Sequence, residues 1–334
     1  MIQPNTDVLV IGAGVIGLTT GTCLAEGGVS VAIVAAEPPQ QTTSVAAGAI
    51  WGPHLVGMDE RVARWADVTR ARFAEYSAPG IGANALERVV RTASGIAAKR
   101  EDKATPPEFA AATVVEPCQP ADVPPGYQSA WRLSAPIIAM PPYLDYLADR
   151  YVRAGGSGPV PARIETFADA RVLAPTAKVI VNCTGCGARD LVPDPDVTPV
   201  RGQVVVTSNP GIAEFFVGTA ADPSDLTYLF PHGDVVVLGG TEQRGNWSRE
   251  PDPATAQRIL AACTVIRPEL AAATIIEHRV GLRPARPLVR LEAEPGDGVT
   301  IVHNYGHGGA GVTLSWGCAE EAATMTLDAL GALA

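Results

Sequence analysis

The sequence carries little charge, and almost none of its positive charge comes from lysine. Charged residues make up 18% of the 334 residues, and the formal net charge is −10. The only lysines are Lys99, Lys103 and Lys178. No block of like charges stands out, whereas binding to nucleic acid usually requires a basic face. A nucleic-acid partner is therefore not expected.

Long apolar runs are also missing. Stretches such as Val8–Ile11 and Val235–Leu238 end within a few residues, whereas a transmembrane helix needs about 20 apolar residues in succession. The first residues lack the basic start and the cleavage site of a secretory signal. Because 47% of the residues are hydrophobic, the chain can bury a sizeable core, and its length favours about two domains. We expect a soluble, cytoplasmic protein without a membrane partner.

Cysteine is too scarce for a disulfide scaffold, with six residues in the whole chain. Cys183 and Cys186 have the spacing of a metal or redox motif, but neither a second cysteine pair nor a nearby histidine completes a zinc site. We interpret them as thiols at the end of a strand, and we expect no metal.

What is present begins with a strand, a glycine loop, a helix, a second strand and an acidic residue. In order these are Val8–Ile11, Gly12 to Gly17, Leu18–Glu26, Val29–Ala35 and Glu37. This order is typical of a dinucleotide-binding βαβ unit. Gly12 makes the tight turn, Gly14 lets the backbone approach a pyrophosphate, and Gly17 lets helix and strand pack closely. The helix N-terminus offers free N–H groups to phosphate. Glu37 is placed to accept hydrogen bonds from ribose hydroxyls, which disfavours NADP.

The chain changes character near Val200. Before it, helices are expected after Asp59 and over Pro141–Val152, and strands at Arg163–Thr166 and Val179–Asn182. The helix after Asp59 has one apolar face, made of Val62, Trp65, Ala66, Thr69 and Phe73. After Val200 we expect mainly antiparallel strands with one hairpin turn at 232–234, and two helices. These elements are Val204–Thr207, Thr227–Phe230, Val235–Leu238, Ala254–Cys263 (helix), Thr274–Val280, Val299–His303 and Val312–Ala332 (helix).

A second glycine-rich turn, from Tyr305 to Thr313, precedes the last helix. A dinucleotide has two ends, so a loop from the far end of the chain can approach a flavin ring while the first loop holds the pyrophosphate. Such a pair of loops is common in flavoproteins and is not expected in NAD-only dehydrogenases. An NAD-linked enzyme remains an alternative at this point, as does a plain flexible turn for the second loop.

Several motifs run colinearly over nearly the whole chain. They are Asp7–Gly17, Thr42–Gly48, Val181–Gly185, Arg201–Gln203, Tyr228 with Pro231, Gly239–Thr241 with Gly245–Trp247, Gly281–Pro287, and His303–Gly309 with Trp316–Cys318. In these motifs the chain resembles the D-amino-acid oxidase family of FAD enzymes, which includes D-aspartate oxidase. The resemblance implies an α/β fold of the glutathione-reductase/p-hydroxybenzoate-hydroxylase-like type. A Rossmann-like FAD-binding domain over 1–50, 145–195 and 285–334 would then carry an inserted, mainly antiparallel β-sheet substrate domain over 51–144 and 196–284.

The resemblance also implies a role for each matched residue. Arg283 would pair with the substrate α-carboxylate, Tyr228 would hydrogen-bond the same group, and the Gly309 carbonyl would receive the amine. The implied FAD contacts are Gly12, Gly14, Val15, Ile16, Gly17, Glu37, Thr42, Thr43, Ala47, Gly48, Ile164, Thr184, Gly308, Gly309, Gly311 and Thr313. His307, in the glycine loop, is interpreted as structural.

The implied reaction is oxidative deamination of a D-amino acid. Hydride passes from the α-carbon to flavin N5, the imino acid hydrolyses to a 2-oxo acid and ammonia, and oxygen restores the flavin with release of hydrogen peroxide. Positioning supplies most of the rate advantage, so no side-chain base is required. A flavin dehydrogenase that does not use oxygen, and a non-catalytic flavin-binding module, are the alternatives. Family members are often dimers, which leaves a homodimer open.

The chain departs from the family at three positions of the substrate pocket. Ser224 and Glu242 stand where animal and yeast members, respectively, carry a tyrosine, and Gly218 stands where relatives often have a bulky side chain. We therefore expect a roomier pocket, with Glu242 facing solvent or, less favoured, meeting a substrate amine. His54 resembles the Pro-His of the D-aspartate oxidase branch, but one histidine is a weak cation near neutral pH. Neutral D-amino acids are the favoured substrates, and D-aspartate is the alternative.

Overall fold

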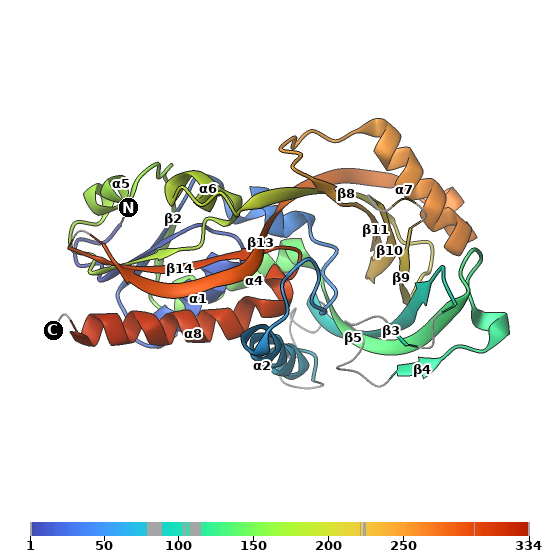
Figure 1. Cartoon of the computed structure of the whole chain (residues 1–334), viewed down its shortest axis with the longest axis horizontal. Helices are drawn as coiled ribbons and strands as arrows, with labels where there is room; N and C mark the ends of the chain where they lie inside the picture. The colour runs from blue at the N-terminus through green and yellow to red at the C-terminus, as the bar shows by residue number, and fades with distance from the viewer. Residues whose placement is uncertain are drawn as a thin grey trace.

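The molecule has two lobes joined by long strands, of which β8 and β13 pass from one lobe to the other (Figure 1). The computed structural model describes residues 2–78, 89–102, 105–106, 115–220, 222, 225–296 and 298–332. Within those residues the strands form one 14-stranded sheet. In sheet order they are β4 (Val115–Pro117), β5 (Ser129–Ile138), β3 (Val90–Lys99), β9 (Phe215–Thr219), β10 (Asp225–His232), β11 (Val235–Thr241), β8 (Thr198–Ser208), β13 (Ile275–Pro295), β14 (Thr300–His307), β7 (Val179–Asn182), β1 (Val8–Ile11), β2 (Val31–Ala35) and β6 (Ser157–Pro161), with β12 (Gln243–Arg244) paired to β8.

The first lobe is built around parallel strands. β1 pairs in parallel with β2 and with β7, and β7 pairs in parallel with β14. Val8 and Val10 pack on one face, Leu9 and Ile11 on the other. Burial on both faces is the reason why this strand is apolar throughout. The helices that cover the lobe are α1 (Val15–Glu26), α2 (Glu60–Tyr76), α4 (Met140–Arg153) and α8 (Gly311–Ala332) on one face, and α5 (Phe167–Leu173) and α6 (Ala188–Leu191) on the other.

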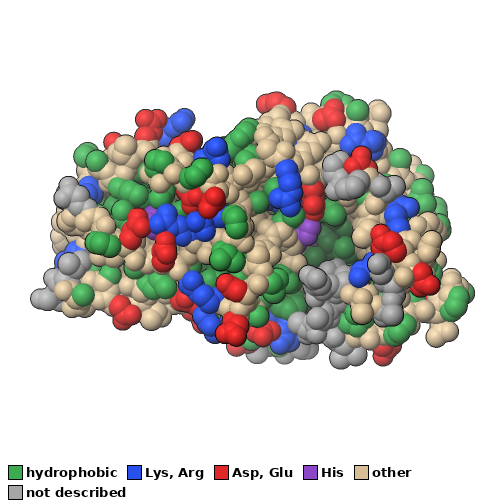
Figure 2. Space-filling view, viewed as in Figure 1, with side chains coloured by type: hydrophobic (Ala, Val, Ile, Leu, Met, Phe, Trp, Pro, Cys, Tyr) green, Lys and Arg blue, Asp and Glu red, His purple; other side chains and the backbone are tan. Residues whose placement is uncertain are grey.

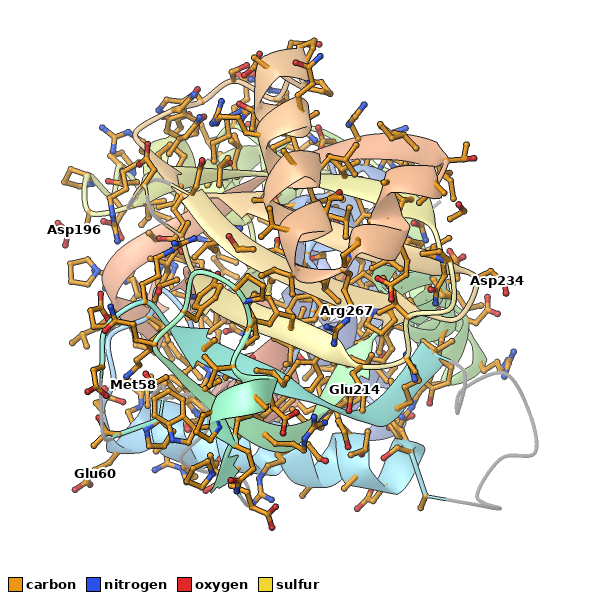
Figure 3. The ribbon with its side chains drawn as sticks, turned by 90° about the vertical axis from the view of Figure 1, so that its right-hand side faces the viewer. Met58, Glu60, Asp196, Glu214, Asp234 and Arg267 are labelled. Atoms are coloured by element: carbon orange, nitrogen blue, oxygen red, sulfur yellow. The ribbon has the colours of Figure 1, made fainter. Side chains whose placement is uncertain are left out.

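The second lobe is mainly antiparallel, as predicted, with β3 and β9 as a parallel pair. Helix α7 (Pro253–Ile266) covers one face of its sheet, where Leu229 packs with Ile259. Figure 3 looks onto this helix, and Arg267 beyond its end faces Glu214, with 3.8 Å between Nη2 and Oε2. Because side chains alternate along a strand, Tyr228 and Phe230 point to the other face. That face is turned toward the first lobe.

Most predicted elements are confirmed. Asp59 accepts a hydrogen bond from the backbone N–H of Val62 at 2.8 Å and caps α2. The buried residues of α2 are the five that its spacing predicts: Val62, Trp65, Ala66, Thr69 and Phe73. The turn at 232–234 joins the antiparallel strands β10 and β11. Within the described residues, no helix is both long enough and apolar enough to cross a membrane. The residue limits predicted for the two domains stay predictions.

The strand predicted at Arg163–Thr166 is wrong. Thr166 caps α5 instead, in a reciprocal arrangement with Asp169, and the strand beside β2 is β6. Several other strands are longer than predicted: β8 begins at Thr198, β10 spans Asp225–His232 and β11 continues to Thr241. β13 continues to Pro295. Pro284 and Pro287 are tolerated because they lie where the strand changes its partner from β8 to β14, and the regular backbone hydrogen bonding of a strand is interrupted there. β14 continues to His307, which shortens the second glycine turn.

The Asp59 cap provides a test of the described packing. Asp59→Ala removes the acceptor for one orphan N–H group at the start of α2, which carries Trp65 and Phe73 into the core. We expect the free energy of unfolding to fall by about 1 kcal/mol, measured by urea denaturation. Asp328→Ala, an exposed aspartate within α8, is the control and should change it by less than about 0.5 kcal/mol. An equal effect of the two substitutions would contradict the capping role.

Candidate active site

A cavity of about 950 Å³ lies between the two lobes, at the upper end of the volumes typical of small-molecule and cofactor sites. Figure 2 shows a hollow between the lobes with hydrophobic side chains on its floor and charged side chains at its rim. Most predicted site residues line the cavity: Gly12, Gly14, Val15, Ile16, Glu37, Thr42, Thr43, Ala47, Gly48, His54, Ile164, Thr184, Gly218, Tyr228, Arg283, Gly308, Gly309, Gly311 and Thr313. Gly17 and Glu242 are not among its lining residues.

The first glycine loop fits a dinucleotide for the reasons its spacing predicts. Gly12 has a φ of +113°, and a Cβ there would lie 2.4 Å from the Cys183 carbonyl oxygen. A Cβ on Gly17 would lie 1.9 Å from the Gly12 carbonyl oxygen, so the helix can approach the loop only without one. Gly14 precedes α1 and leaves the first turn of the helix open to the cavity. These features form a cradle for a pyrophosphate.

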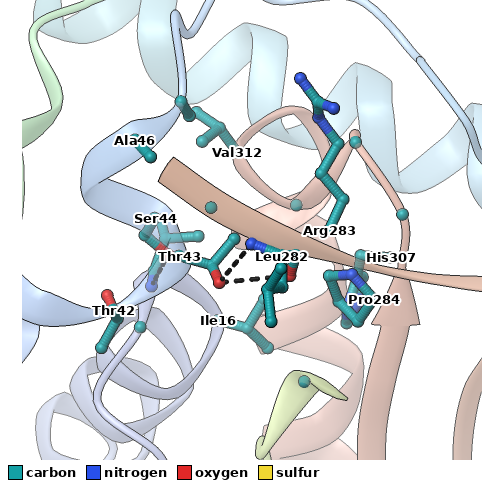
Figure 4. A pocket seen from close by; sticks show the side chains of 18 of the residues that line it. Ile16, Thr42, Thr43, Ser44, Ala46, Leu282, Arg283, Pro284, His307 and Val312 are labelled. Carbon is teal, nitrogen blue, oxygen red and sulfur yellow. Dashed lines mark hydrogen bonds between the residues drawn. The ribbon is translucent and has the colours of Figure 1, made fainter. Parts of the chain in front are cut away.

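The segment Thr42–Gly48 forms a wall of the same cavity and is locked to β13. The Thr43 hydroxyl accepts a hydrogen bond from the Leu282 N–H and donates one to the Leu282 carbonyl, both at 3.2 Å (Figure 4). A Cβ on Gly281 would come within 3.1 Å of Ala46 Cβ, and one on Gly48 within 2.8 Å of the Phe230 ring. Small residues therefore crowd this segment because two backbones meet there.

Glu37 is engaged by a residue that the sequence did not single out. Arg249 forms an ion pair with Glu37 through Nη1 and donates from Nη2 to the Gln41 carbonyl at 2.7 Å. Arg249 lines the cavity at the same end as Glu37 and Ile164. Its loop is held by the buried Arg201, which donates to the Ser248 carbonyl at 3.0 Å. A residue of the second lobe thus reaches the end of β2.

Arg283 and Tyr228 lie together in the wall of the cavity. Arg283 donates from Nη1 to the Thr241 carbonyl at 2.8 Å, on the opposite side of β13 from Leu282 (Figure 4). A Cβ on Gly202 would lie 2.5 Å from Arg283 Nη2, and one on Gly239 would lie 1.9 Å from Tyr228 Cζ. Burial raises the pKa of Tyr228, although the nearby Arg283 charge opposes the rise. The phenol is therefore a protonated hydrogen-bond donor at neutral pH.

The second glycine turn is shorter than predicted, and the segment that contains His54 and Leu55 packs directly against it. Gly308 has a φ of +55°, and a Cβ there would lie 1.8 Å from the Leu55 carbonyl oxygen. A Cβ on Gly309 would lie 2.6 Å from His54 Cδ2. At the start of α8 the Thr313 hydroxyl donates to the Gly52 carbonyl at 2.9 Å and accepts from the Gly52 N–H at 3.1 Å. Both hydrogen bonds of the Thr313 hydroxyl are thus made to the backbone of Gly52.

Glu242 does not face solvent, which corrects the favoured expectation for this residue. Its carboxylate Oε1 lies 2.6 Å from His54 Nε2, and its side chain is only 15% exposed. Burial would raise the pKa of Glu242, but the neighbouring His54, Arg283 and Arg244 outweigh burial and lower it. Glu242 is therefore an ionised carboxylate held against the histidine.

The expectation that Gly218 opens the pocket is also corrected. A Cβ at Gly218 would lie 2.4 Å from the Tyr127 hydroxyl, so Tyr127 fills the space that a side chain would take. Val217 pairs directly with Tyr228 in the β9–β10 ladder and also lines the cavity. Opposed residues share a face of the sheet, so Val217 is the pocket residue that the sequence missed. Ser224 lies outside the described residues.

The remaining candidates have structural surroundings. His307 is 2% exposed, and burial lowers its pKa to about 3, so it is neutral. Burial raises the pKa values of Cys183 and Cys186 to about 12. In the part of the chain that the structure describes, no group of three or more His, Cys, Asp or Glu side chains has a metal-binding arrangement.

Known proteins agree with this architecture. Residues 7–325 match the model of the DAO family, described as FAD dependent oxidoreductase. The chain is 44% identical to the D-amino-acid oxidase of Rubrobacter xylanophilus, with 96% of each chain covered, and 33% identical to the D-aspartate oxidase of Homo sapiens, with 98% of this chain and 96% of the relative covered. The glycine oxidase of Geobacillus kaustophilus has the same fold, with a TM-score of 0.78 over 96% of this chain and 94% of that chain at 18% identity. These findings confirm the predicted fold class and the FAD cofactor. The chain belongs to the DAO family of FAD-dependent oxidoreductases.

Proposed function

We propose that this protein is a D-amino-acid oxidase that converts neutral D-amino acids to 2-oxo acids, ammonia and hydrogen peroxide. The observation that carries the proposal is the pairing of Arg283 with Tyr228 in the wall of the cavity. A planar guanidinium next to a protonated phenol suits an amino-acid carboxylate. The 44% identity to a D-amino-acid oxidase supports the same reaction.

The residues present fit FAD. The loop of Gly12, Gly14 and Gly17 would hold the pyrophosphate at the N-terminus of α1, Glu37 the ribose, and the Thr42–Gly48 segment with the turn at Gly308–Gly309 the flavin side of the cavity. When bound, the flavin supplies the two-electron oxidation of the substrate α-carbon and passes the electrons on to oxygen.

The chain's own residues supply orientation. Arg283 has one N–H group fixed on the Thr241 carbonyl, so its remaining N–H groups are presented in a set direction to a carboxylate. Tyr228 adds a second donor, and the Gly309 carbonyl would accept from the amine. With the carboxylate and the amine both held, only one enantiomer of the substrate would direct its single α-hydrogen toward the flavin. Such positioning alone accounts for a large share of the rate, so no side-chain base is invoked.

The decisive experiment is the visible spectrum of the purified holoenzyme without oxygen. We expect D-alanine to bleach the oxidised flavin band and L-alanine to leave it unchanged. Readmission of air should restore the band and release peroxide in the amount of flavin reduced. Bleaching by neither enantiomer would overturn the proposal. Bleaching by D-alanine without return in air would identify a dehydrogenase that does not use oxygen.

Three further features belong to this proposal. We place the enzyme in the cytoplasm and regard it as a homodimer, as family members often are. We also keep the predicted division into an FAD-binding domain (residues 1–50, 145–195 and 285–334) and a substrate domain (residues 51–144 and 196–284). Support for this division comes from the two lobes of Figure 1.

Arg249 is predicted to help retain FAD, because it holds Glu37 at the ribose end of the cavity from the other lobe. Arg249→Ala should raise the Kd for FAD about tenfold, which corresponds to loss of one charge-assisted contact. The measurement is quenching of flavin fluorescence on binding to the apoprotein. Arg153→Ala removes a guanidinium that is 79% exposed on α4 and is the control. Equal FAD affinity of the wild type and the Arg249 variant would contradict this role.

A further inference from the structure

Two ionisable side chains from distant parts of the sequence meet beside the substrate end of the cavity. His54 lies in the irregular segment after Ile50, and Glu242 lies between β11 and β12. Their Nε2 and Oε1 atoms are 2.6 Å apart. The His54 side chain is 41% exposed and lines the cavity, whereas Glu242 is largely covered and stands behind it. The histidine is thus held from behind by a carboxylate.

The pair adjoins both proposed anchors of the substrate. The His54 ring lies against Gly309, since a Cβ there would be 2.6 Å from His54 Cδ2. On the other side, Arg283 donates to the carbonyl of Thr241, the residue directly before Glu242. Substrate groups anchored on Arg283 and Gly309 are therefore next to His54 and Glu242. A substrate side chain that extends from the same α-carbon is exposed to their charges.

The Glu242 charge disfavours a second substrate carboxylate beside the pair. The ionised Glu242 faces three basic groups: His54, Arg283 and, from β12, Arg244. In the proposed function Arg283 forms an ion pair with the substrate α-carboxylate. His54, charged or neutral, has its Nε2 atom turned to Glu242. An acidic side chain would come close to the Glu242 charge, and like charges at close range are unfavourable.

We propose that Glu242 is a specificity-determining residue that, through its pairing with His54, makes this site discriminate against D-amino acids with an acidic side chain. The inference rests on the proposed function and deepens it, because it separates the two activities named for the relatives, D-amino-acid oxidase and D-aspartate oxidase. Glu242 acts by charge at short range and not by filling the pocket, since it is not among the residues that line it.

The test compares rates of flavin reduction by D-aspartate and D-alanine in oxygen-free holoenzyme, expressed as the ratio of the two kcat/KM values. Glu242→Gln keeps the shape and removes the charge, and the ratio should rise at least tenfold, mainly through a lower KM for D-aspartate. His54→Gln removes the group that contacts the Glu242 carboxylate at 2.6 Å and so exposes more of its charge, and the ratio should fall severalfold. Glu277→Gln removes a carboxylate that pairs with Arg279 on β13, and the ratio should not change.

Opposite shifts in the two variants are the signature of a charge effect, because a loosened pocket would alter both in the same direction. A ratio within twofold of the wild type in either variant, with FAD still bound, would overturn the inference while the proposed function stands. So would a wild-type preference for D-aspartate over D-alanine. If no D-amino acid reduces the wild-type flavin, the proposed function itself fails, and the inference falls with it.

Discussion

Replacing Arg283 by leucine is expected to lower kcat/KM for D-alanine by about 10²-fold or more, mainly through a higher KM. The guanidinium is the group proposed to meet the substrate carboxylate, and loss of one partner of a desolvated charge pair costs several kcal/mol. FAD binding should be retained, because Arg283 points to the opposite side of β13 from Leu282, which is bonded to the Thr43 segment. Steady-state kinetics and the flavin spectrum of the same preparation provide both readouts.

The control for this prediction is Arg258→Leu, on the outer helix α7, where the guanidinium is 52% exposed and pairs with Asp225. Its KM should equal that of the wild type. A KM within threefold of the wild-type value in the Arg283 variant would refute the assignment of the carboxylate anchor, whatever the value of kcat.

A valine at Gly17 is expected to weaken FAD binding by at least about 10²-fold, since it overpacks a contact between two backbone segments. Its Cβ would lie 1.9 Å from the Gly12 carbonyl oxygen, and backbone has no room to yield. The helix must then move away from the loop that would hold the pyrophosphate. The flavin-to-protein absorbance ratio after gel filtration and a fluorescence titration of the apoprotein measure the loss.

Gly331→Val is the matched control, because a Cβ on this glycine in the last turn of α8 has no heavy atom within 4 Å. It should purify with its full flavin content. If the Gly17 variant also kept its flavin, the close approach of helix and loop would not be needed for binding. Circular dichroism of both variants separates a loss of FAD from a loss of fold.

Local signals in the sequence were sufficient for the first strand, glycine loop and helix of the first lobe. Val8–Ile11 is apolar at every position because the strand is buried on both faces, and Gly12 and Gly17 after it stand where no Cβ fits. The Asp59 cap is equally local. By contrast, Arg163–Thr166 was misassigned, because alternation over four residues is weak evidence and the Thr166–Asp169 capping box outweighs it.

The site was predictable only where a motif encodes it. Arg283 and Tyr228 stand in motifs, whereas Arg249 and Val217 carry no local signal and reach the cavity through strand pairing and a folded-back loop. The same limit explains the two corrections. Whether Glu242 meets solvent or His54, and whether Tyr127 fills the space beside Gly218, depends on contacts between residues far apart in the chain. Such contacts produce no periodic pattern of residues in the sequence from which they could be predicted.

Strand β13 has a consequence for how this enzyme can diversify. Leu282 is bound to the cofactor-side segment through Thr43, and the next residue, Arg283, points to the opposite side. Leu282, which contacts the proposed flavin side of the cavity, and Arg283, the proposed carboxylate anchor, are consecutive residues of one strand. The distance between these two parts of the site is therefore set by the covalent chain and does not change when the lobes move relative to each other. Changes in substrate range are then expected outside β13, at positions such as Val217 on the cavity wall and Glu242 behind His54, while the alignment of the α-carbon stays constant.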